Sequence, residues 1–286
     1  MSYIRSASLT SLAMLAFAGN SLLCRAALKD TAIDAASFTS IRLISGALIL
    51  WLIVRSRQTS ASGAGNWPSA FALFAYAGGF SLAYVSLPAG TGALLLFGAV
   101  QATMIGYAIR AGERLLKLQV LGLLLALAGL VGLLLPGLSA PPLTGSLLMI
   151  GAGVAWGIYS LRGKGSGDPT RVTAGNFLRT VPMAAVLSLL LWQNTQLDSA
   201  GVAYAIASGA LASGIGYAIW YTALPLLQAS HAATVQLSVP VIAAAGGVVL
   251  LGEPLTLRLL VASVAILGGI ALVILEKPQP AQARSQ

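Results

Sequence analysis

The sequence has very few residues that could bind a metal, form a disulfide or carry out acid–base chemistry. Its 286 residues include one cysteine, Cys24, and one histidine, His231. A disulfide within the chain is therefore excluded, as is a zinc site built from several Cys or His ligands. Only seven residues are acidic, and all of them lie in loops or at the ends of predicted helices. Because no buried Ser/His/Asp set or carboxylate pair is visible, we predict no enzymatic activity, no cofactor and no metal.

Charge is also scarce, and apolar residues are abundant. Charged residues make up 8% of the chain, hydrophobic residues make up 57%, and the mean hydropathy is +0.88. A water-soluble fold could not bury so much apolar surface, so we predict a membrane protein. The net charge of +9 comes from sixteen Lys and Arg residues that are scattered between apolar segments. Since they form no patch or stripe, we predict no nucleic-acid partner.

Ten runs of mainly apolar residues are each long enough to cross a bilayer, which takes about 20 residues in a helix. Proline, glycine and charged residues separate the runs. We predict helices at 7–28, 36–54, 68–87, 91–109, 115–135, 143–161, 173–193, 200–222, 230–250 and 255–275. The fold class is therefore an all-α polytopic membrane protein.

The first run could also be a secretory signal, because Ala16-Phe17-Ala18 resembles a cleavage site. Its apolar character continues to Leu28, however, and it has a counterpart in the second half. We therefore predict an uncleaved first transmembrane helix.

The chain contains an internal repeat. Gly112-Glu113-Arg114-Leu115 recurs 140 residues later as Gly252-Glu253-Pro254-Leu255, and Arg25 and Arg42 recur 137 residues later as Arg162 and Arg179. The repeats span 1–138 and 139–286, with five helices each. Because five is odd, the two halves must cross the membrane in opposite directions, as in many transporters with inverted repeats.

The loop charges predict the orientation. The loops and ends on the side of the chain termini hold eleven Lys and Arg residues, whereas the other loops hold three, Arg25, Lys29 and Arg258. Cytoplasmic loops carry the excess of positive charge. We therefore predict a multi-pass protein of the cell (inner) membrane with both termini in the cytoplasm.

Several motifs together resemble a known family. They are the two Gly-Glu-x-Leu motifs, Ala155-Trp156-Gly157 in the sixth predicted helix, and Pro240, thirteen residues before Glu253. With its two five-helix halves, the chain resembles the EamA-like ten-helix exporters of the drug/metabolite transporter superfamily over essentially its whole length. It departs from the pattern in the first half, where Val100 stands at the position matching Pro240, so only the second half is predicted to carry a proline kink.

The resemblance implies export of small organic solutes, which in this family include amino acids, nucleosides and drugs. The nearest likeness is to the YddG-type amino-acid exporters. In a transporter of this kind, a central cavity lies between the two halves and opens to each side of the membrane in turn.

The residues predicted to bind substrate are neutral, and many are aromatic. Phe80 and Tyr84 on the third predicted helix match the positions of Tyr217 and Tyr221 on the eighth, 137 residues later. Gly79 and Gly216 directly precede Phe80 and Tyr217, so we predict hinges there. Such faces suit a cavity that stacks planar or apolar groups. The alternative is an interfacial aromatic belt, and it stays open for Trp220 and Tyr221 at the helix end.

Polar candidates complete the predicted site. The substrate-binding prediction comprises Asn20, Phe80, Tyr84, Gln101, Trp156, Tyr159, Tyr217, Gln236 and Ser238, with Pro240, Gly79 and Gly216 as hinge or kink positions. Pro240 leaves the Gln236 carbonyl without its helical donor, so that this carbonyl can face substrate or water. For Asn20 and Trp156 the cavity role rests mainly on the resemblance, and helix packing is the alternative.

The remaining ionisable residues are predicted to be structural. Glu113 and Glu253 should cap the helices that follow them and, at most, form hydrogen bonds that gate the cavity. His231 opens the ninth predicted helix. Arg42 and Arg179 lie within about two turns of a helix end, so they should snorkel toward the membrane surface. With no carboxylate in mid-membrane, the sequence favours facilitated diffusion or exchange over proton coupling.

The sequence therefore predicts an exporter of small organic metabolites that works by alternating access. Amino acids with aromatic or large apolar side chains are the favoured substrates; drugs or nucleosides, and a proton-coupled carrier, are the alternatives. The predicted partners are a small-molecule substrate and the lipid bilayer. Because ten paired helices can enclose a cavity in one chain, we expect a functional monomer.

Overall fold

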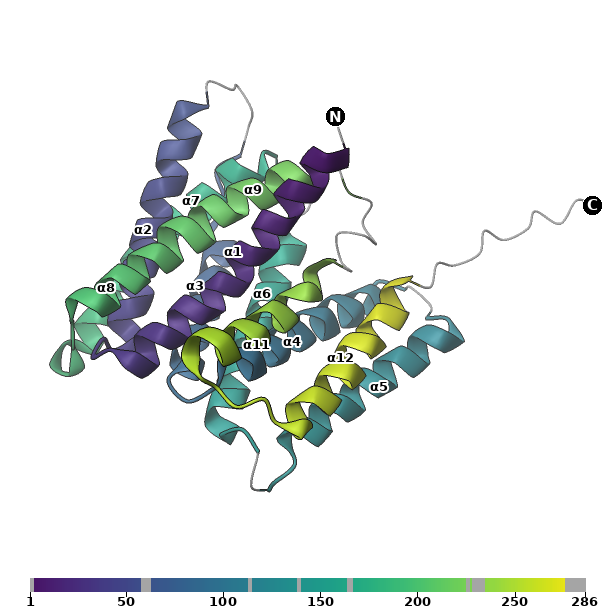
Figure 1. Cartoon of the computed structure of the whole chain (residues 1–286). Coiled ribbons are helices and arrows are strands. Elements are labelled where there is room, and N and C mark those ends of the chain that lie inside the picture. The colour runs from purple at the N-terminus through teal and green to yellow at the C-terminus, as the bar shows by residue number, and fades with distance from the viewer. Residues whose placement is uncertain are drawn as a thin grey trace, which may run out of the picture.

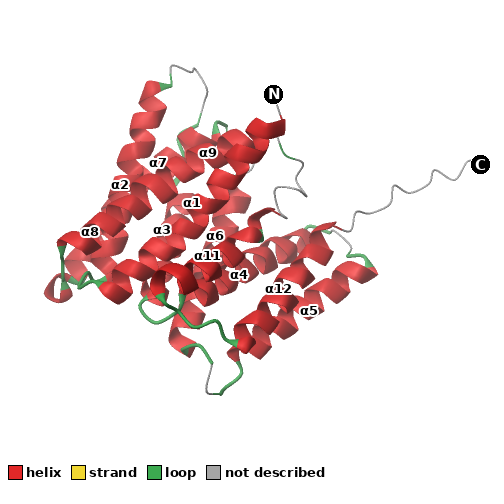
Figure 2. Cartoon of the chain, viewed as in Figure 1, coloured by secondary structure: helices red, strands yellow, loops and turns green. Residues whose placement is uncertain are grey.

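Long apolar helices make up almost all of the structure (Figure 2). The computed structural model describes residues 3–57, 63–112, 115–137, 140–163, 167–224, 227 and 235–275. Its helices are α1 (Tyr3–Asp30), α2 (Ala35–Ser56), α3 (Trp67–Tyr84), α4 (Ala89–Arg110), α5 (Lys117–Leu134), α6 (Leu143–Arg162), α7 (Pro169–Leu190), η1 (Trp192–Asn194), α8 (Ser199–Ile206), η2 (Ala207–Ile215), α9 (Gly216–Ala223), α11 (Ser238–Leu251) and α12 (Leu257–Leu275).

The helices agree with the ten predicted segments. The short helices α8, η2 and α9 follow one another without a break and form one segment, Ser199–Ala223, so the described part holds ten helical segments of at least 14 residues. Eight of them are long and apolar enough to cross a membrane, and α11 is a shorter apolar helix. The prediction of an all-helical polytopic membrane protein is confirmed. The start of the ninth predicted helix and the predicted border between residues 138 and 139 lie outside the described residues.

Polar residues in the loops fix where several helices begin. The carboxylate of Asp34 accepts hydrogen bonds from the backbone N–H groups of Ala36 and Ser37 at the start of α2. Asn66, Asp168 and Asp198 cap α3, α7 and α8 in the same way. A side-chain oxygen at this position satisfies backbone donors that the first turn leaves open. This explains why several of the few acidic residues lie between the apolar runs.

Replacing Asp34 by alanine should lower the stability of the protein by about 1 kcal/mol, because α2 loses its cap. Burial would raise the pKa of the Asp34 carboxyl, but hydrogen bonds from Ser37, Gln196 and Ala36 lower it below its ordinary value of 3.8. A lowered pKa means that the stabilisation is present above pH 3.8 and is lost as the pH falls below it. In thermal unfolding of the purified protein, the difference from wild type should therefore stay constant between about pH 7 and 5 and shrink only in stronger acid.

Asp30→Ala is the control for this prediction, because the Asp30 side chain is half exposed and caps no helix. It should unfold at the wild-type temperature at every pH. If Asp30→Ala and Asp34→Ala lowered the unfolding temperature equally, the cap would not be the cause.

The helices run between two faces of the molecule (Figure 1). We call the face where α1 begins and α12 ends the terminal face. The opposite face carries the connections that follow α1, α3, α5, α7 and α11. α5 and α12 lie side by side at one edge of the bundle (Figure 1).

The contacts between helices have a twofold pattern. α2 packs on α7, α4 on α11 and α5 on α12, so that helices five segments apart meet each other. α3 packs on α6, and the matching segment of the second half, η2 with α9, packs on α1. This is the pattern that two inverted halves would produce around a common axis.

Two local departures from regular α-helix lie near the centre of the bundle. Ala207–Ile215 is a π-helix, which the sequence did not predict. A turn at Leu237 separates the helical residues 235–236 from α11, where the ring of Pro240 cannot donate a hydrogen bond to the Gln236 carbonyl. The wide turns of a π-helix often occur at functional sites.

Candidate functional site

A cavity of about 480 Å³ lies at the centre of the bundle. Residues of α1, α3, α4, α6, α7, η2 and α9 line it, together with Gln236 before α11. It extends from the middle of α1 and α3 to the terminal face, where Gly163, Gly167 and Pro169 line it. Ligand cavities usually measure about 300–1,000 Å³. The cavity is therefore large enough for a small organic molecule.

Seven of the nine predicted substrate-binding residues line this cavity, although they come from six different segments. They are Asn20, Phe80, Gln101, Trp156, Tyr159, Tyr217 and Gln236. The sequence thus placed residues from both halves of the chain around one space. That these residues bind substrate stays a prediction.

Aromatic rings form most of the cavity wall around Trp156. Its ring stacks on Tyr217 at 5.3 Å between centroids with an interplanar angle of 18°, and on Tyr159 at 5.2 Å and 30°. Tyr76 approaches the same indole at 4.8 Å. Phe17 meets Tyr217 at 5.7 Å, so the aromatic contacts continue on to α1. Such offset and tilted arrangements are the favoured geometries of aromatic pairs.

Polar groups interrupt the aromatic wall at a few points. The Asn20 amide nitrogen donates to the hydroxyl oxygen of Tyr76 at 3.3 Å, and the Asn20 Oδ1 accepts from Ser208 Oγ in the π-helix at 2.6 Å. Nearer the terminal face, the Tyr159 hydroxyl donates to Thr173 at 3.4 Å. Apolar walls with a few fixed polar groups are typical of small-molecule sites.

Two predicted residues do not line the cavity. Tyr84 is fully buried between the cavity and the opposite face, and its hydroxyl donates to the Ala89 carbonyl at 3.2 Å. Ser238 is half-buried, and its hydroxyl donates to the Val235 carbonyl at 2.6 Å. Both hydroxyls are held by the backbone of the chain itself.

The predicted hinge glycines lie at matching helix contacts. A Cβ at Gly79 would come within 3.2 Å of the Leu148 carbonyl on α6, and one at Gly216 within 2.9 Å of the Ala16 Cβ on α1. Both glycines therefore allow two helices to approach closely. Pro240 is buried in the first turn of α11. Their role as hinges stays a prediction.

Sequence reasoning missed Tyr76, which lines the cavity and contacts Asn20, Phe80 and Trp156. Tyr76 lies four residues before Phe80, and residues spaced by four share one face of a helix. Because the sequence predicts that Phe80 faces the cavity, the same spacing also predicts that Tyr76 faces it.

The prediction that Arg42 snorkels to the membrane surface is wrong. Its side chain is 1% exposed, and Nη2 donates to the Tyr76 hydroxyl at 2.9 Å. Snorkelling needs an open path to the helix end, and here α7 and η2 pack closely against α2. Arg179, its counterpart in the second half, is half-buried and donates to the Ala64 and Gly175 carbonyls near the terminal face, as predicted.

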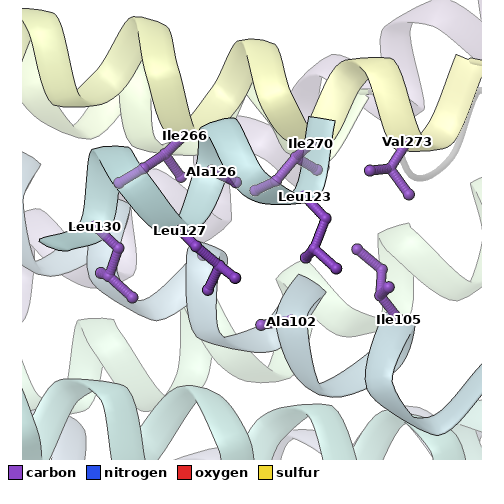
Figure 3. A pocket seen from close by; sticks show the side chains of 10 residues that line it. Ala102, Ile105, Leu123, Ala126, Leu127, Leu130, Ile266, Ile270 and Val273 are labelled. Carbon is purple, nitrogen blue, oxygen red and sulfur yellow. The ribbon is translucent and has the colours of Figure 1, made fainter. Parts of the chain in front are cut away.

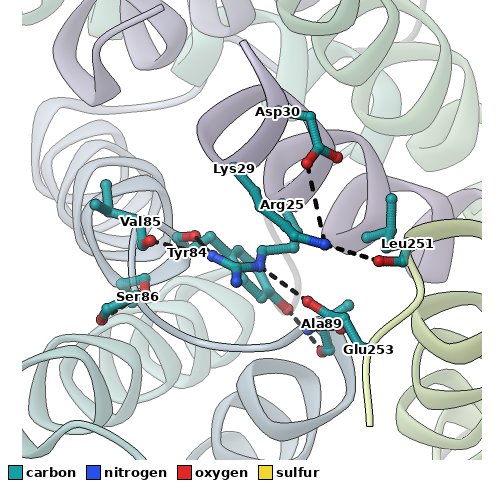
Figure 4. Close-up of polar contacts among 10 residues, drawn as sticks. Arg25, Lys29, Asp30, Tyr84, Val85, Ser86, Ala89, Leu251 and Glu253 are labelled. Carbon is teal, nitrogen blue, oxygen red and sulfur yellow. Dashed lines mark hydrogen bonds and ion pairs between the residues drawn. The ribbon is translucent and has the colours of Figure 1, made fainter. Parts of the chain in front are cut away.

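An ion pair between Arg25 and Glu253 lies between the cavity and the opposite face, and Figure 4 shows its contacts. Arg25 Nε meets Glu253 Oε1 at 2.9 Å, and Arg25 Nη1 donates to the carbonyls of Tyr84 and Val85. Glu253 Oε2 accepts from the Ala89 backbone N–H at 2.7 Å. These contacts tie the ends of α1, α3 and α11 to the start of α4, and we call them the opposite-face clamp.

The prediction that Glu253 caps the helix that follows it, α12, is therefore wrong, because its carboxylate caps the start of α4. Gly252 has a φ of +61°, a left-handed conformation that ends α11 and turns the chain toward α4. Glu113 and His231, which were also predicted to be structural, lie outside the described residues.

A second, much smaller hollow lies between α4, α5 and α12 (Figure 3). Its volume is about 30 Å³, and all ten lining residues are glycines, alanines or larger apolar residues. Without a polar group to orient a ligand, and with a volume far below that of ligand cavities, it is a gap in helix packing. The central cavity is the better candidate site.

Comparison with known proteins finds a transporter family and several similar bacterial proteins. The EamA-like transporter family matches residues 143–275. An uncharacterized protein of Pseudomonas aeruginosa is 62% identical over 94% of both chains. The threonine/homoserine exporter RhtA of Salmonella typhimurium is 35% identical over 54% of this chain and 55% of its own. A probable amino-acid metabolite efflux pump of the same species is 26% identical over 64% and 67%.

One solved crystal structure superposes with a TM-score of 0.66 and covers 95% of this chain and 98% of its own, at 21% sequence identity. At this identity the likeness shows the fold alone.

Proposed function

We propose a substrate and a mechanism for this chain from the premise that it belongs to the EamA-like transporter family, within the drug/metabolite transporter superfamily. It is a multi-pass membrane protein and an exporter of small molecules. Its substrates, in our proposal, are amino acids with aromatic or large apolar side chains. The observation that carries this proposal is the aromatic cavity of about 480 Å³ around Trp156.

The cavity chemistry supports an amphipathic substrate. The stacked rings of Trp156, Tyr159 and Tyr217 offer a surface for a planar or apolar side chain. Asn20 and Gln101, both only 6% exposed, supply polar groups for the other end of the molecule. One relative is named a threonine/homoserine exporter and another a probable amino-acid metabolite efflux pump, which supports amino acids in general as substrates.

The arrangement of cavity and clamp supports alternating access. The cavity extends to the terminal face, and the opposite-face clamp closes the other end. If the terminal face is cytoplasmic, as the loop charges predict, substrate enters from the cytoplasm of an inner-membrane protein. The two halves, 1–138 and 139–286, would then rock about Gly79, Gly216 and Pro240 to open the opposite face.

The charges around the cavity support facilitated diffusion or exchange. No acidic residue is among the described residues that line it. Proton relays in membranes use buried carboxylates or histidines. We therefore propose that the concentration gradient of substrate drives transport.

Replacing Trp156 by alanine should reduce amino-acid flux at least about tenfold, because the central stacking surface is lost. The assay is uptake of labelled phenylalanine, leucine, threonine and a nucleoside into proteoliposomes that contain the purified protein, with and without a pH gradient. Trp192→Ala is the matched control, because Trp192 is 74% exposed in η1 and lies outside the cavity.

Saturable uptake of phenylalanine or leucine without a pH gradient, stimulated by amino acid on the far side, would support the proposal. Uptake of the nucleoside alone would refute the substrate class. A requirement for the pH gradient would refute the proposed energy source.

A further inference from the structure

Arg42 carries a positive charge that no acidic residue in the described part of the chain neutralises. It lies two turns from the start of α2 and is 1% exposed. Its guanidinium lies over the rings of Tyr76 and Phe80, at 5.2 and 4.8 Å from their centroids. In the part of the chain that the structure describes, Nε and Nη1 have no hydrogen-bond partner, and no acidic residue forms an ion pair with Arg42.

A lone buried charge of this kind is unfavourable for folding, because water no longer solvates it. The two aromatic faces offset part of this cost through cation–π attraction. A guanidinium also remains protonated in proteins, so Arg42 cannot lose its charge. The charge is therefore a permanent feature of the cavity region.

Tyr76 connects this charge to the cavity. Its hydroxyl oxygen accepts one hydrogen bond from Arg42 at 2.9 Å and another from Asn20 at 3.3 Å. Two donors occupy the lone pairs of the oxygen, so the hydroxyl hydrogen is left to donate. Because Tyr76 lines the cavity, that donor is available to a bound molecule. The charged donor on the other side of the oxygen strengthens it.

We propose that Tyr76 and Arg42 form the subsite for the carboxylate of the transported amino acid. The carboxylate accepts the Tyr76 hydroxyl hydrogen, and Arg42 behind the ring supplies the positive charge that compensates it. The inference deepens the proposed function and rests on it. It adds a selection rule: the transporter accepts substrates with a carboxylate and rejects amines that lack one, since these carry only positive charge.

The second half of the chain does not repeat this arrangement. Arg179 occupies the position that matches Arg42, but its guanidinium donates to the backbone carbonyls of Ala64 and Gly175. Tyr76 and Arg42 therefore mark one side of the cavity, and substrate should bind in one orientation.

The test is competition against uptake of labelled phenylalanine in proteoliposomes. The competitors are unlabelled phenylalanine and phenylalaninamide, which keeps the ring and the amine but has no carboxylate. In the wild type, the amide should need a concentration at least about tenfold higher than phenylalanine for half-inhibition. In Arg42→Met and in Tyr76→Phe this ratio should fall to about threefold or less.

Arg179→Met is the matched control, because it removes the same charge from the equivalent helix without facing Tyr76; it should keep the wild-type ratio. Tyr76→Phe retains the ring and its packing, so it carries the test if Arg42→Met does not fold. Equal inhibition by phenylalanine and its amide in the wild type would overturn the subsite while the amino-acid transporter stood. Transport of an uncharged nucleoside with no amino-acid uptake would overturn both.

Discussion

Replacing Glu253 by glutamine should make Cys24 react with a maleimide at least about tenfold faster than in the wild type. Cys24 is the only cysteine of the sequence and is fully buried on α1, beside Arg25 of the opposite-face clamp. Its rate of labelling therefore reports how often the bundle opens at that end. The measurement is the time course of N-ethylmaleimide addition to the purified protein, followed by intact-mass spectrometry.

The physical reason is that glutamine cannot satisfy both partners of Glu253. One carboxylate oxygen pairs with Arg25 and the other accepts from the Ala89 N–H. A side-chain amide has one acceptor and one donor group, so one of these contacts would set donor against donor. Breaking a buried ion pair on one side costs roughly 3–5 kcal/mol, because the other charge stays buried. The conformation with a closed opposite face should therefore become less populated, and the conformation with an open opposite face more populated.

Asp30→Asn is the matched control for the clamp. Asp30 lies 4.0 Å from Lys29 on the same end of α1, with half of its side chain exposed. Exposed pairs contribute about 0–1 kcal/mol, so labelling of Cys24 should change less than about twofold. If Glu253→Gln labelled at the wild-type rate while remaining folded, the ion pair would not hold the opposite face closed.

The number and order of helices could be predicted from the sequence because the signals are local. Apolar runs of about 20 residues between prolines and charged residues mark the spans, and Asp34, Asp168 and Asp198 mark helix starts. The shared offset also placed Phe80 and Tyr217 at one cavity. The sequence could not show how far along its helix each residue lies from the cavity. Tyr84 shares a helix face with Phe80, yet it lies one turn beyond the cavity.

The contacts that determine where the side chains of Arg42 and Glu253 lie come from distant parts of the chain. Glu253 meets a backbone N–H that is 164 residues away, and Arg42 is enclosed by helices of the other half. No spacing within one helix reveals such partners. The π-helix at Ala207–Ile215 also lacked a signal, since its Gly, Ala and Ser residues are equally compatible with an α-helix inside a membrane.

Gly209 in this π-helix gives the second large expected effect. A Cβ at Gly209 would overlap the Ser45 hydroxyl and the Arg42 carbonyl of α2. Gly46 faces the same contact, where a Cβ would come within 3.1 Å of the Gly209 carbonyl. The two helices therefore touch backbone to backbone, and a methyl group at Gly209 would have to push them apart.

Gly209→Ala should lower the stability by about 1–3 kcal/mol or more, as other overpacked cores do. A backbone carbonyl cannot rotate away as a flexible side chain can, so the cost should lie at the upper end of this range. In thermal unfolding of the detergent-purified protein, the midpoint should fall by several degrees.

Gly78→Ala on α3 is the matched control, because a Cβ there would meet nothing within 4 Å. In an open helical position, alanine is more favourable than glycine by about 1 kcal/mol, so this variant should unfold at the wild-type temperature or above it. The contact also holds α2 in the position that brings Arg42 to Tyr76. Any folded Gly209→Ala protein should therefore discriminate less between phenylalanine and its amide. If the Gly209→Ala and Gly78→Ala variants had equal stability and equal discrimination, the tight contact at Gly209 would be refuted.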